Sequence, residues 1–143
     1  MPATSDPRQA RSRRGLALGL AGAAAATAAI LLSFDPTAPD SALPPCPFHW
    51  ATGLFCPGCG STRTLHALLH GDLATAMSMN PLMVISLPFV ALLLADKLGW
   101  IRASWQTALA HIGDARAWAV LLIGYGVLRN LPWLPFSALA PGA

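Results

Sequence analysis

GLALGLAGAAAATAAILLSF, residues 15–34, is a run of twenty residues without a charge, and it decides the fold class. As a helix rising 1.5 Å per residue it would be about 30 Å long, which matches the hydrocarbon core of a bilayer. Four arginines precede it within residues 1–14, namely Arg8, Arg11, Arg13 and Arg14. The pattern predicts a basic N-terminal segment followed by a first transmembrane helix over 15–34.

A cleaved signal peptide is the competing interpretation of this segment, because arginines followed by an apolar stretch also describe one. The apolar part of a signal is usually about 7–15 residues, shorter than this run. No clear small-x-small cleavage site follows Phe34. These two points favour a retained span.

The composition of the whole chain agrees with a membrane protein. Of its 143 residues 55% are hydrophobic and 10% are charged, whereas soluble chains carry about 25% charged residues. The apolar content excludes intrinsic disorder, and three cysteines are too few for a disulfide framework. The length suggests one domain.

Two further spans are expected. Residues 80–98 are apolar up to Asp96-Lys97, with Pro81 in a first turn that needs no amide donor and Pro88 inside. Residues 115–131 hold twelve uncharged residues between Arg116 and Arg129, so they cross a bilayer only if both arginines snorkel toward the headgroups.

The segment between these spans, residues 99–114, carries Ile101, Trp105, Leu109 and Ile112 at helical spacing. The spacing predicts an interfacial helix, or equally a loop helix packed on the spans. The sequence therefore predicts an all-α integral membrane protein with about three transmembrane helices, a short extracytoplasmic or re-entrant amphipathic helix and a cytoplasmic interfacial helix.

The basic residues set the expected orientation. Because basic residues collect on the cytoplasmic side, the N-terminus and residues 99–114 belong inside. Residues 35–79 and the Pro-rich tail 132–143 then lie outside. The lipid bilayer is the expected partner. Nucleic acid is excluded as a partner because the basic residues flank spans rather than line one face.

All three cysteines lie in the predicted outer loop, in the stretch CPFHWATGLFCPGC, residues 46–59. Four interpretations remain open: a structural disulfide or thiol clamp, a thiol–disulfide redox site using Cys56 and Cys59 with Cys46 as a possible partner, a zinc site, or plain packing. The zinc site would use Cys46, His49, Cys56 and Cys59 as ligands. A following helix over 62–70 would favour the thiolate of Cys59, and to a lesser extent that of Cys56, through its N-terminal amides.

Several polar residues share this predicted outer side. His66 and His70 stand four apart on the 62–70 helix, a spacing compatible with a metal but more often a polar helix face. Asp72 is expected to cap a short helix that ends at Met79. We also expect a structural polar cluster that fixes a re-entrant turn, with Arg63 pairing to Asp72 or Asn80. The full set expected in this cluster is Arg63, Asp72, Asn80, Arg129 and Asn130.

These motifs carry a family resemblance. The Cys46-Pro47-Phe48 segment, the run Thr52 to Arg63 with its C-P-G-C-G-x-x-R motif, Gly71-Asp72 and Asn80-Pro81 occur in the order that resembles domain-of-unknown-function family 2752. The resemblance covers roughly residues 43–100. It implies a small multi-span protein of the bacterial plasma (inner) membrane with no established activity. The positions that match the family's pattern are Cys46, Thr52, Gly53, Cys56, Pro57, Gly58, Cys59, Gly60, Arg63, Gly71, Asp72, Asn80 and Pro81.

The functional prediction is a non-enzymatic accessory or scaffold component that contacts other membrane proteins. In it, the CPGCG loop is a structural or recognition element and no cofactor is needed. The alternative is a membrane thiol–disulfide redox or zinc-binding protein acting through Cys56 and Cys59.

Overall fold

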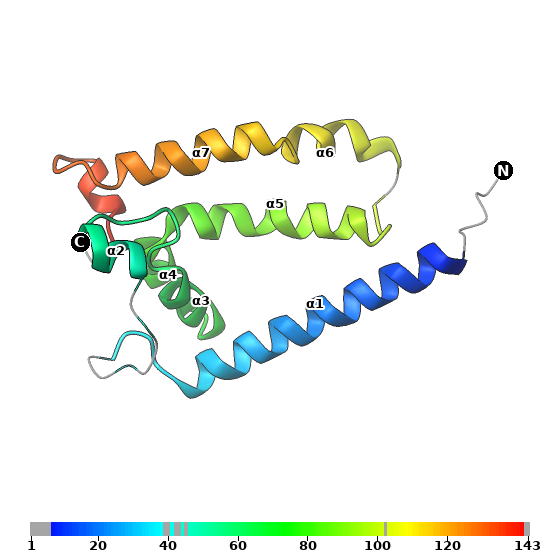
Figure 1. The fold of residues 1–143 in the computed structure, drawn as a ribbon, viewed down its shortest axis with the longest axis horizontal. Coiled ribbons are helices and arrows are strands. Elements are labelled where there is room, and N and C mark those ends of the chain that lie inside the picture. The colour runs from blue at the N-terminus through cyan, green and yellow to red at the C-terminus, as the bar shows by residue number, and fades with distance from the viewer. Residues whose placement is uncertain (1–6, 39–40, 42–43, 45, 102, 142–143) are drawn as a thin grey trace.

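The chain is described by a computed structural model for residues 7–38, 41, 44, 46–101 and 103–141. All of the regular secondary structure in these residues is helical (Figure 1). The elements are α1 (Pro7–Ser33), α2 (Pro47–Thr52), α3 (Ser61–Leu69), α4 (Leu73–Met79), α5 (Pro81–Lys97), the 3-10 helix η1 (Ala103–Trp105), α6 (Gln106–Ile112), α7 (Ala115–Leu128) and the 3-10 helix η2 (Phe136–Leu139). The all-α class is thereby confirmed.

The three long helices lie where the apolar runs predict helices. α1 starts at Pro7 rather than Gly15, so the basic segment before the apolar run is also helical. α5 starts with Pro81 in its first turn and contains Pro88, as expected. α7 ends at Leu128, and Arg129 is its C-cap. The predicted third span ends at residue 131, three residues beyond the end of this helix.

By length and composition, the described residues contain one helix that could cross a membrane alone, α1. α4 and α5 pass the same test as a pair, but they are bent by 107° at Asn80, which makes them a broken span or a re-entrant element. α7 is apolar but has only 14 residues. The number of crossings therefore depends on how the bent pair and α7 sit in lipid.

The short helices form a group at one end of the molecule. In Figure 1, α2, α3 and α4 lie together there, beside the start of α5 and the end of α7. α3 and α4 pack on each other, and α3 also contacts α1 and α5. Asp72 accepts a hydrogen bond from the Thr75 amide (2.9 Å), so the predicted N-cap of α4 is confirmed.

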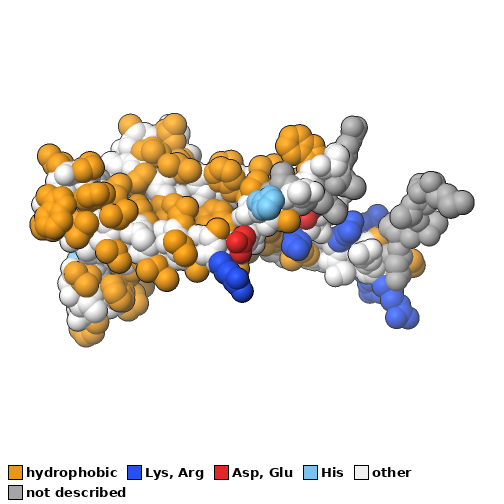
Figure 2. All heavy atoms as spheres, turned by 90° about the horizontal axis from the view of Figure 1, so that it is seen from above, with side chains coloured by type: hydrophobic (Ala, Val, Ile, Leu, Met, Phe, Trp, Pro, Cys, Tyr) orange, Lys and Arg blue, Asp and Glu red, His pale blue; other side chains and the backbone are white. Residues whose placement is uncertain are grey.

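Polar and charged side chains are buried beside hydrophobic ones. Thr64, Asn80 and Arg129 are each at most 1% exposed, and with Cys59 and Ala76 they lie at the end that holds the short helices. By contrast, α1, α5 and α7 expose large apolar side chains such as Leu18 and Val120. Figure 2 shows hydrophobic side chains over much of one face and Lys and Arg side chains gathered toward the other end. A fully buried cation together with long helices that expose large apolar side chains is unlike the usual pattern of a soluble domain.

Candidate thiol and metal site

The cysteine loop is built from two tight local structures. Cys46 is the N-cap of α2, and Pro47 fills the first helical position, where no amide donor is needed. α2 ends at Gly53 in a left-handed conformation (φ 72°), which returns the chain toward Cys56. The Cys59 amide then donates to the Cys56 carbonyl (3.0 Å), which closes the Pro-Gly turn. Both structures position a cysteine.

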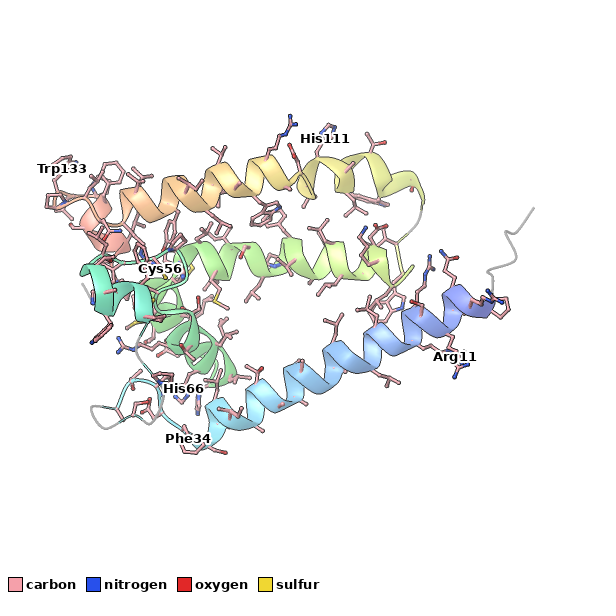
Figure 3. The ribbon with its side chains drawn as sticks, viewed as in Figure 1. Arg11, Phe34, Cys56, His66, His111 and Trp133 are labelled. Carbon is pink, nitrogen blue, oxygen red and sulfur yellow. The ribbon has the colours of Figure 1, made fainter. Side chains whose placement is uncertain are left out.

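The turn brings all three cysteines together. The Sγ of Cys56 lies 3.4 Å from that of Cys46 and 3.2 Å from that of Cys59. The three sulfur atoms all lie within 4.8 Å of one another, and the described cysteines are free thiols. The Cys56 amide also donates to the sulfur of Cys59 (3.2 Å). This thiol cluster, Cys46, Cys56 and Cys59, is at the short-helix end of the molecule (Figure 3).

The thiols of Cys46 and Cys59 differ in acidity. The backbone N–H of His49 in the first turn of α2 favours the thiolate of Cys46, and Cys59 adds to this, so the pKa of Cys46 falls to about 7. Burial raises the pKa of Cys59 to about 12. The expectation that the following helix makes the Cys59 thiolate favourable is therefore wrong, because burial and the neighbouring thiols outweigh the hydrogen bond from the Cys56 amide. Cys46 is the acidic thiol.

The carbonyl groups of the loop converge on Arg129. Its Nη1 donates to the carbonyls of Cys56 (2.9 Å) and Cys59 (3.2 Å) and lies 3.4 Å from that of Pro57. Its guanidinium also lies over the rings of Phe55 and Tyr125. The buried cation thus holds three carbonyls of the turn at once, which fixes the backbone under the sulfur atoms.

Two asparagines complete this support. Asn80 donates from Nδ2 to the carbonyls of Pro57 (3.0 Å) and Cys59 (3.3 Å), and its Oδ1 accepts from the Met83 amide at the start of α5. Asn130 accepts from the Phe55 amide and donates to the Phe55 carbonyl, both at 2.8 Å. The loop is therefore bound to both α5 and α7.

The predicted polar cluster is thus formed in part. Arg129, Asn80 and Asn130 surround the loop as one group. Arg63 instead donates to the Pro36 carbonyl (3.2 Å), and Asp72 is occupied by its cap and by the Thr75 hydroxyl (2.6 Å). The ion pairs among the described residues do not include one between Arg63 and Asp72. These two residues fix neighbouring segments rather than the thiol cluster.

His49 lies outside the cluster of possible metal ligands. Its Nδ1 faces the Leu54 carbonyl (3.3 Å), and its ring stacks on Phe55 with centroids 4.5 Å apart. The spacing predicted four zinc ligands, including His49. The structure brings together only the three sulfur atoms of that set. A fourth ligand position on a metal held there would be open to water or to another molecule.

The pair His66 and His70 is also not arranged as a metal site. A carbonyl only accepts, so Nδ1 of His66 donates to Leu31 (2.7 Å) and Nδ1 of His70 donates to the His66 carbonyl (2.8 Å). Nε2 of His66 lies 3.8 Å from the Asp35 carboxylate. These contacts join α3 to the end of α1.

Two residues of the site were not foreseen. Tyr125 lies under the Arg129 guanidinium, with its ring centroid 4.9 Å away. Gly126 faces Pro57 so closely that a Cβ there would meet the proline ring at 3.0 Å. Tyr125 precedes Arg129 by one helical turn, so helical spacing from the arginine was the signal that pointed to it. Contact between Gly126 and Pro57 depends on tertiary packing alone.

The comparison with protein families gave a match. Residues 46–94 match the model of the family described as Protein of unknown function (DUF2752). This segment of the chain is similar to that family. This confirms the predicted family resemblance, and the matched residues hold the three cysteines, α2 to α4 and most of α5. Neither the curated proteins nor the solved structures gave a match. The DUF2752 match assigns no activity, so function is argued from the site.

Proposed function

We propose that the protein is a non-enzymatic accessory or scaffold component of the bacterial plasma membrane whose DUF2752 segment binds zinc through Cys46, Cys56 and Cys59. The observation that carries the proposal is the convergence of three sulfur atoms within 4.8 Å. Thiolates are preferred zinc ligands, and a three-thiolate site leaves one position for a ligand from a partner protein.

The distances suit such a site after a small expansion. Zinc–sulfur bonds of about 2.3 Å at tetrahedral angles put sulfur atoms about 3.8 Å apart. The two shortest separations here are 3.2 and 3.4 Å, so the thiols need to move apart by about half an ångström, a shift on the scale of ordinary side-chain motion. Arg129 and Asn80 hold the backbone in place while the side chains adjust, which is the support that metal ligands require.

The proposed membrane placement has α1, α5 and α7 as three spans, with the N-terminus in the cytoplasm and the thiol cluster outside. Exposed apolar side chains on these helices support it, since lipid is the solvent that such surfaces require. The distribution of basic residues supports the orientation. In an oxidising outer compartment the thiols would form disulfides unless they were protected. Bound zinc would give that protection.

The test is the zinc content of the full-length protein purified in mild detergent without chelator. We expect about one zinc per chain, and loss of zinc in Cys46→Ser, Cys56→Ser and Cys59→Ser. His49→Ala is the matched control from the same loop, because His49 lies outside the cluster, and it should retain zinc. Absence of zinc from the folded wild-type protein would refute the proposal.

Thiol–disulfide exchange is the second candidate, favoured by the short contact between the acidic Cys46 and Cys56. In that case the Cys46 thiolate attacks a disulfide of an extracytoplasmic protein and releases one of its thiolates. Cys56 then attacks the Cys46 sulfur, which forms a Cys46–Cys56 disulfide and releases the second thiolate. The partner gains two electrons and the released thiolates take up two protons.

The two candidates predict different chemical states of the same purified protein. Zinc binding predicts that thiol labelling requires prior chelation but not reduction. Exchange predicts that labelling of Cys46 and Cys56 requires prior reduction, and that Cys56→Ser traps a mixed disulfide between Cys46 and its partner. Labelling without either treatment would contradict both.

A further inference from the structure

A second site lies at the other end of the molecule, where the start of α1 meets the end of α5. Figure 3 places the labels of Arg11 and Cys56 at opposite ends of the molecule. A cavity of about 320 Å³ opens beside α1 at this far end. The residues that line it are Gln9, Ala10, Arg13, Arg14, Ala17, Leu98 and Trp100. None of them belongs to the thiol cluster.

The charge of this cavity is positive. Arg13 and Arg14 line it, and no carboxylate does. The ion pairs among the described residues include neither arginine. An adjoining cavity of about 450 Å³ shares Gln9 and Arg13 and adds Lys97, with Asp96 as its single carboxylate. The first cavity therefore presents two cations without an internal counter-ion.

The Arg13 side chain lies against the turn that ends α5. Gly99 has φ +78°, and a Cβ placed on it would collide with the Arg13 guanidinium. The guanidinium thus lies directly against the backbone of this turn, so the cavity is assembled from two segments far apart in sequence. A glycine at this position satisfies both the left-handed backbone and the close approach.

The rest of the lining is apolar. Ala10, Ala17 and Leu98 line the cavity together with Trp100, whose side chain is 76% exposed. Tryptophan beside cations is typical of the level of lipid headgroups, where one end of the ring meets hydrocarbon and the other meets water. The cavity therefore combines two cations with a surface that accepts hydrocarbon.

We propose that this cavity binds the headgroup of an anionic phospholipid. Arg13 and Arg14 would bind the lipid phosphate through charge-assisted hydrogen bonds, and Gln9 would donate to its oxygens or to the glycerol. Ala17, Leu98 and Trp100 would contact the first carbons of the acyl chains. Basic pockets between membrane helices on the cytoplasmic side are suited to such headgroups.

A lipid fits these residues better than free phosphate does. A free phosphate would use the two arginines and leave the apolar lining against water, whereas a lipid covers both parts of the cavity. The inference rests on the proposed membrane placement of α1 but uses none of the cysteines. Its test is therefore independent of the test for zinc binding.

The test is lipid retention by the full-length protein in native mass spectrometry from detergent. Phosphatidylglycerol and phosphatidylcholine with the same acyl chains are the two lipids compared. We expect phosphatidylglycerol to bind more tightly, with affinity falling about fivefold for each basic residue removed, so about 25-fold in the Arg13→Gln/Arg14→Gln double variant. Arg11→Gln is the control, since Arg11 is on the side of α1 away from α5 and lines neither cavity (Figure 3).

Three outcomes would overturn the inference. They are equal retention of the two lipids, an effect of Arg11→Gln as large as that of the double variant, and complete displacement of phosphatidylglycerol by millimolar inorganic phosphate. The helical content of each variant in detergent checks folding. If the double variant fails that check, Arg14→Gln alone is used, with the expected loss of about fivefold.

Discussion

Arg129 is a buried guanidinium whose charge is balanced by dipoles rather than by a carboxylate. Among the described residues it has carbonyl acceptors in the loop, a further one at Met79 (3.5 Å), and two aromatic rings. It also stands at the C-terminal end of α7, where the helix dipole favours a cation. Its planar fork of donors can reach several acceptors at once, which a lysine ammonium on a flexible stem cannot do.

We therefore expect Arg129→Lys to destabilise the protein despite the conserved charge. Loss of two or three hydrogen bonds to buried carbonyls should cost about 1–3 kcal/mol. The measurement is thermal unfolding of the full-length protein in detergent, with Arg116→Lys on the same helix as the exposed control. Equal melting temperatures for the two variants would contradict the role assigned to Arg129.

A comparison of Gly60 and Gly71 can separate the cost of a strained backbone from the cost of a steric clash. Gly60 and Gly71 have similar left-handed conformations (φ +84° and +75°), but only at Gly60 would a Cβ meet another atom, the Met79 carbonyl oxygen at 2.7 Å. Gly71→Ala should cost about 1–2 kcal/mol from the conformation alone. Gly60→Ala should cost clearly more, measured by the same unfolding experiment. If the two substitutions cost the same, the start of α3 and the end of α4 do not pack as described.

The acidity of Cys46 predicts a pH profile for the metal-free, reduced protein. With its pKa lowered to about 7, Cys46 is mostly thiolate at pH 8, and its reaction with iodoacetamide should fall as the pH drops through 7. Cys59, with its pKa raised to about 12, should stay unreactive across this range. Peptide mass spectrometry reads out each site. Faster alkylation of Cys59 than of Cys46 would show that the assignment of acidity is reversed.

At the scale of the elements, the cysteine loop is held between α5 and α7. α7 approaches the loop closely because Gly126 lacks a side chain opposite Pro57, whereas a Cβ at Gly124, two residues earlier, would meet nothing within 4 Å. Helix α7 is therefore both an apolar helix and one wall of the thiol site. Its position should affect the sulfur atoms although it contributes none of them.

Gly126→Leu should push α7 away from the loop and weaken zinc binding at least about tenfold, as expected when the support behind metal ligands is disturbed. Gly124→Leu on the same helix should leave zinc affinity unchanged. Zinc competition with a chromophoric chelator measures both. An equal effect of the two substitutions would mean that the change acts through α7 insertion or stability and not through the contact with Pro57.

Short-range sequence patterns predicted the helices and their caps better than they predicted the contacts between distant residues. The Asp72 cap, the helix after it and Pro81 in the first turn of α5 depend on neighbours within four residues, and all three were predictable. The pairing of Arg63 was not, because the Pro36 carbonyl that accepts from it lies 27 residues away. Convergence of the thiols followed from spacing for Cys56 and Cys59, but the approach of Cys46 depends on the return of the chain after α2.

At the scale of the whole molecule, polar contacts lie inside one end and apolar side chains cover the long helices. The proposed three-span arrangement puts the thiol cluster and the C-terminus on the same outer side, and the arginine cavity on the inner side. α7 is the critical element, since its 14 residues span about 21 Å and need help from snorkelling arginines to cross.

This arrangement predicts the behaviour of reporter fusions. A phosphatase that is active only outside the cytoplasm should be active when fused after Ala143 or after Gly53, and inactive when fused after Gly99. A fluorescent protein that folds only in the cytoplasm should give the opposite pattern. Activity of the phosphatase after Gly99 would invert the proposed topology, and fluorescence after Ala143 would show that α7 does not cross.

The bend at Asn80 has a mechanical consequence. The side-chain amide of Asn80 links α5 to the thiol turn. Its oxygen accepts a hydrogen bond from the first turn of α5, and its nitrogen donates to backbone carbonyls of the thiol turn. α5 therefore cannot tilt about this point without pulling on Pro57 and Cys59. If α5 lies in lipid, a thinner or thicker bilayer changes its tilt, and Asn80 converts that tilt into a change in the spacing of the three sulfur atoms.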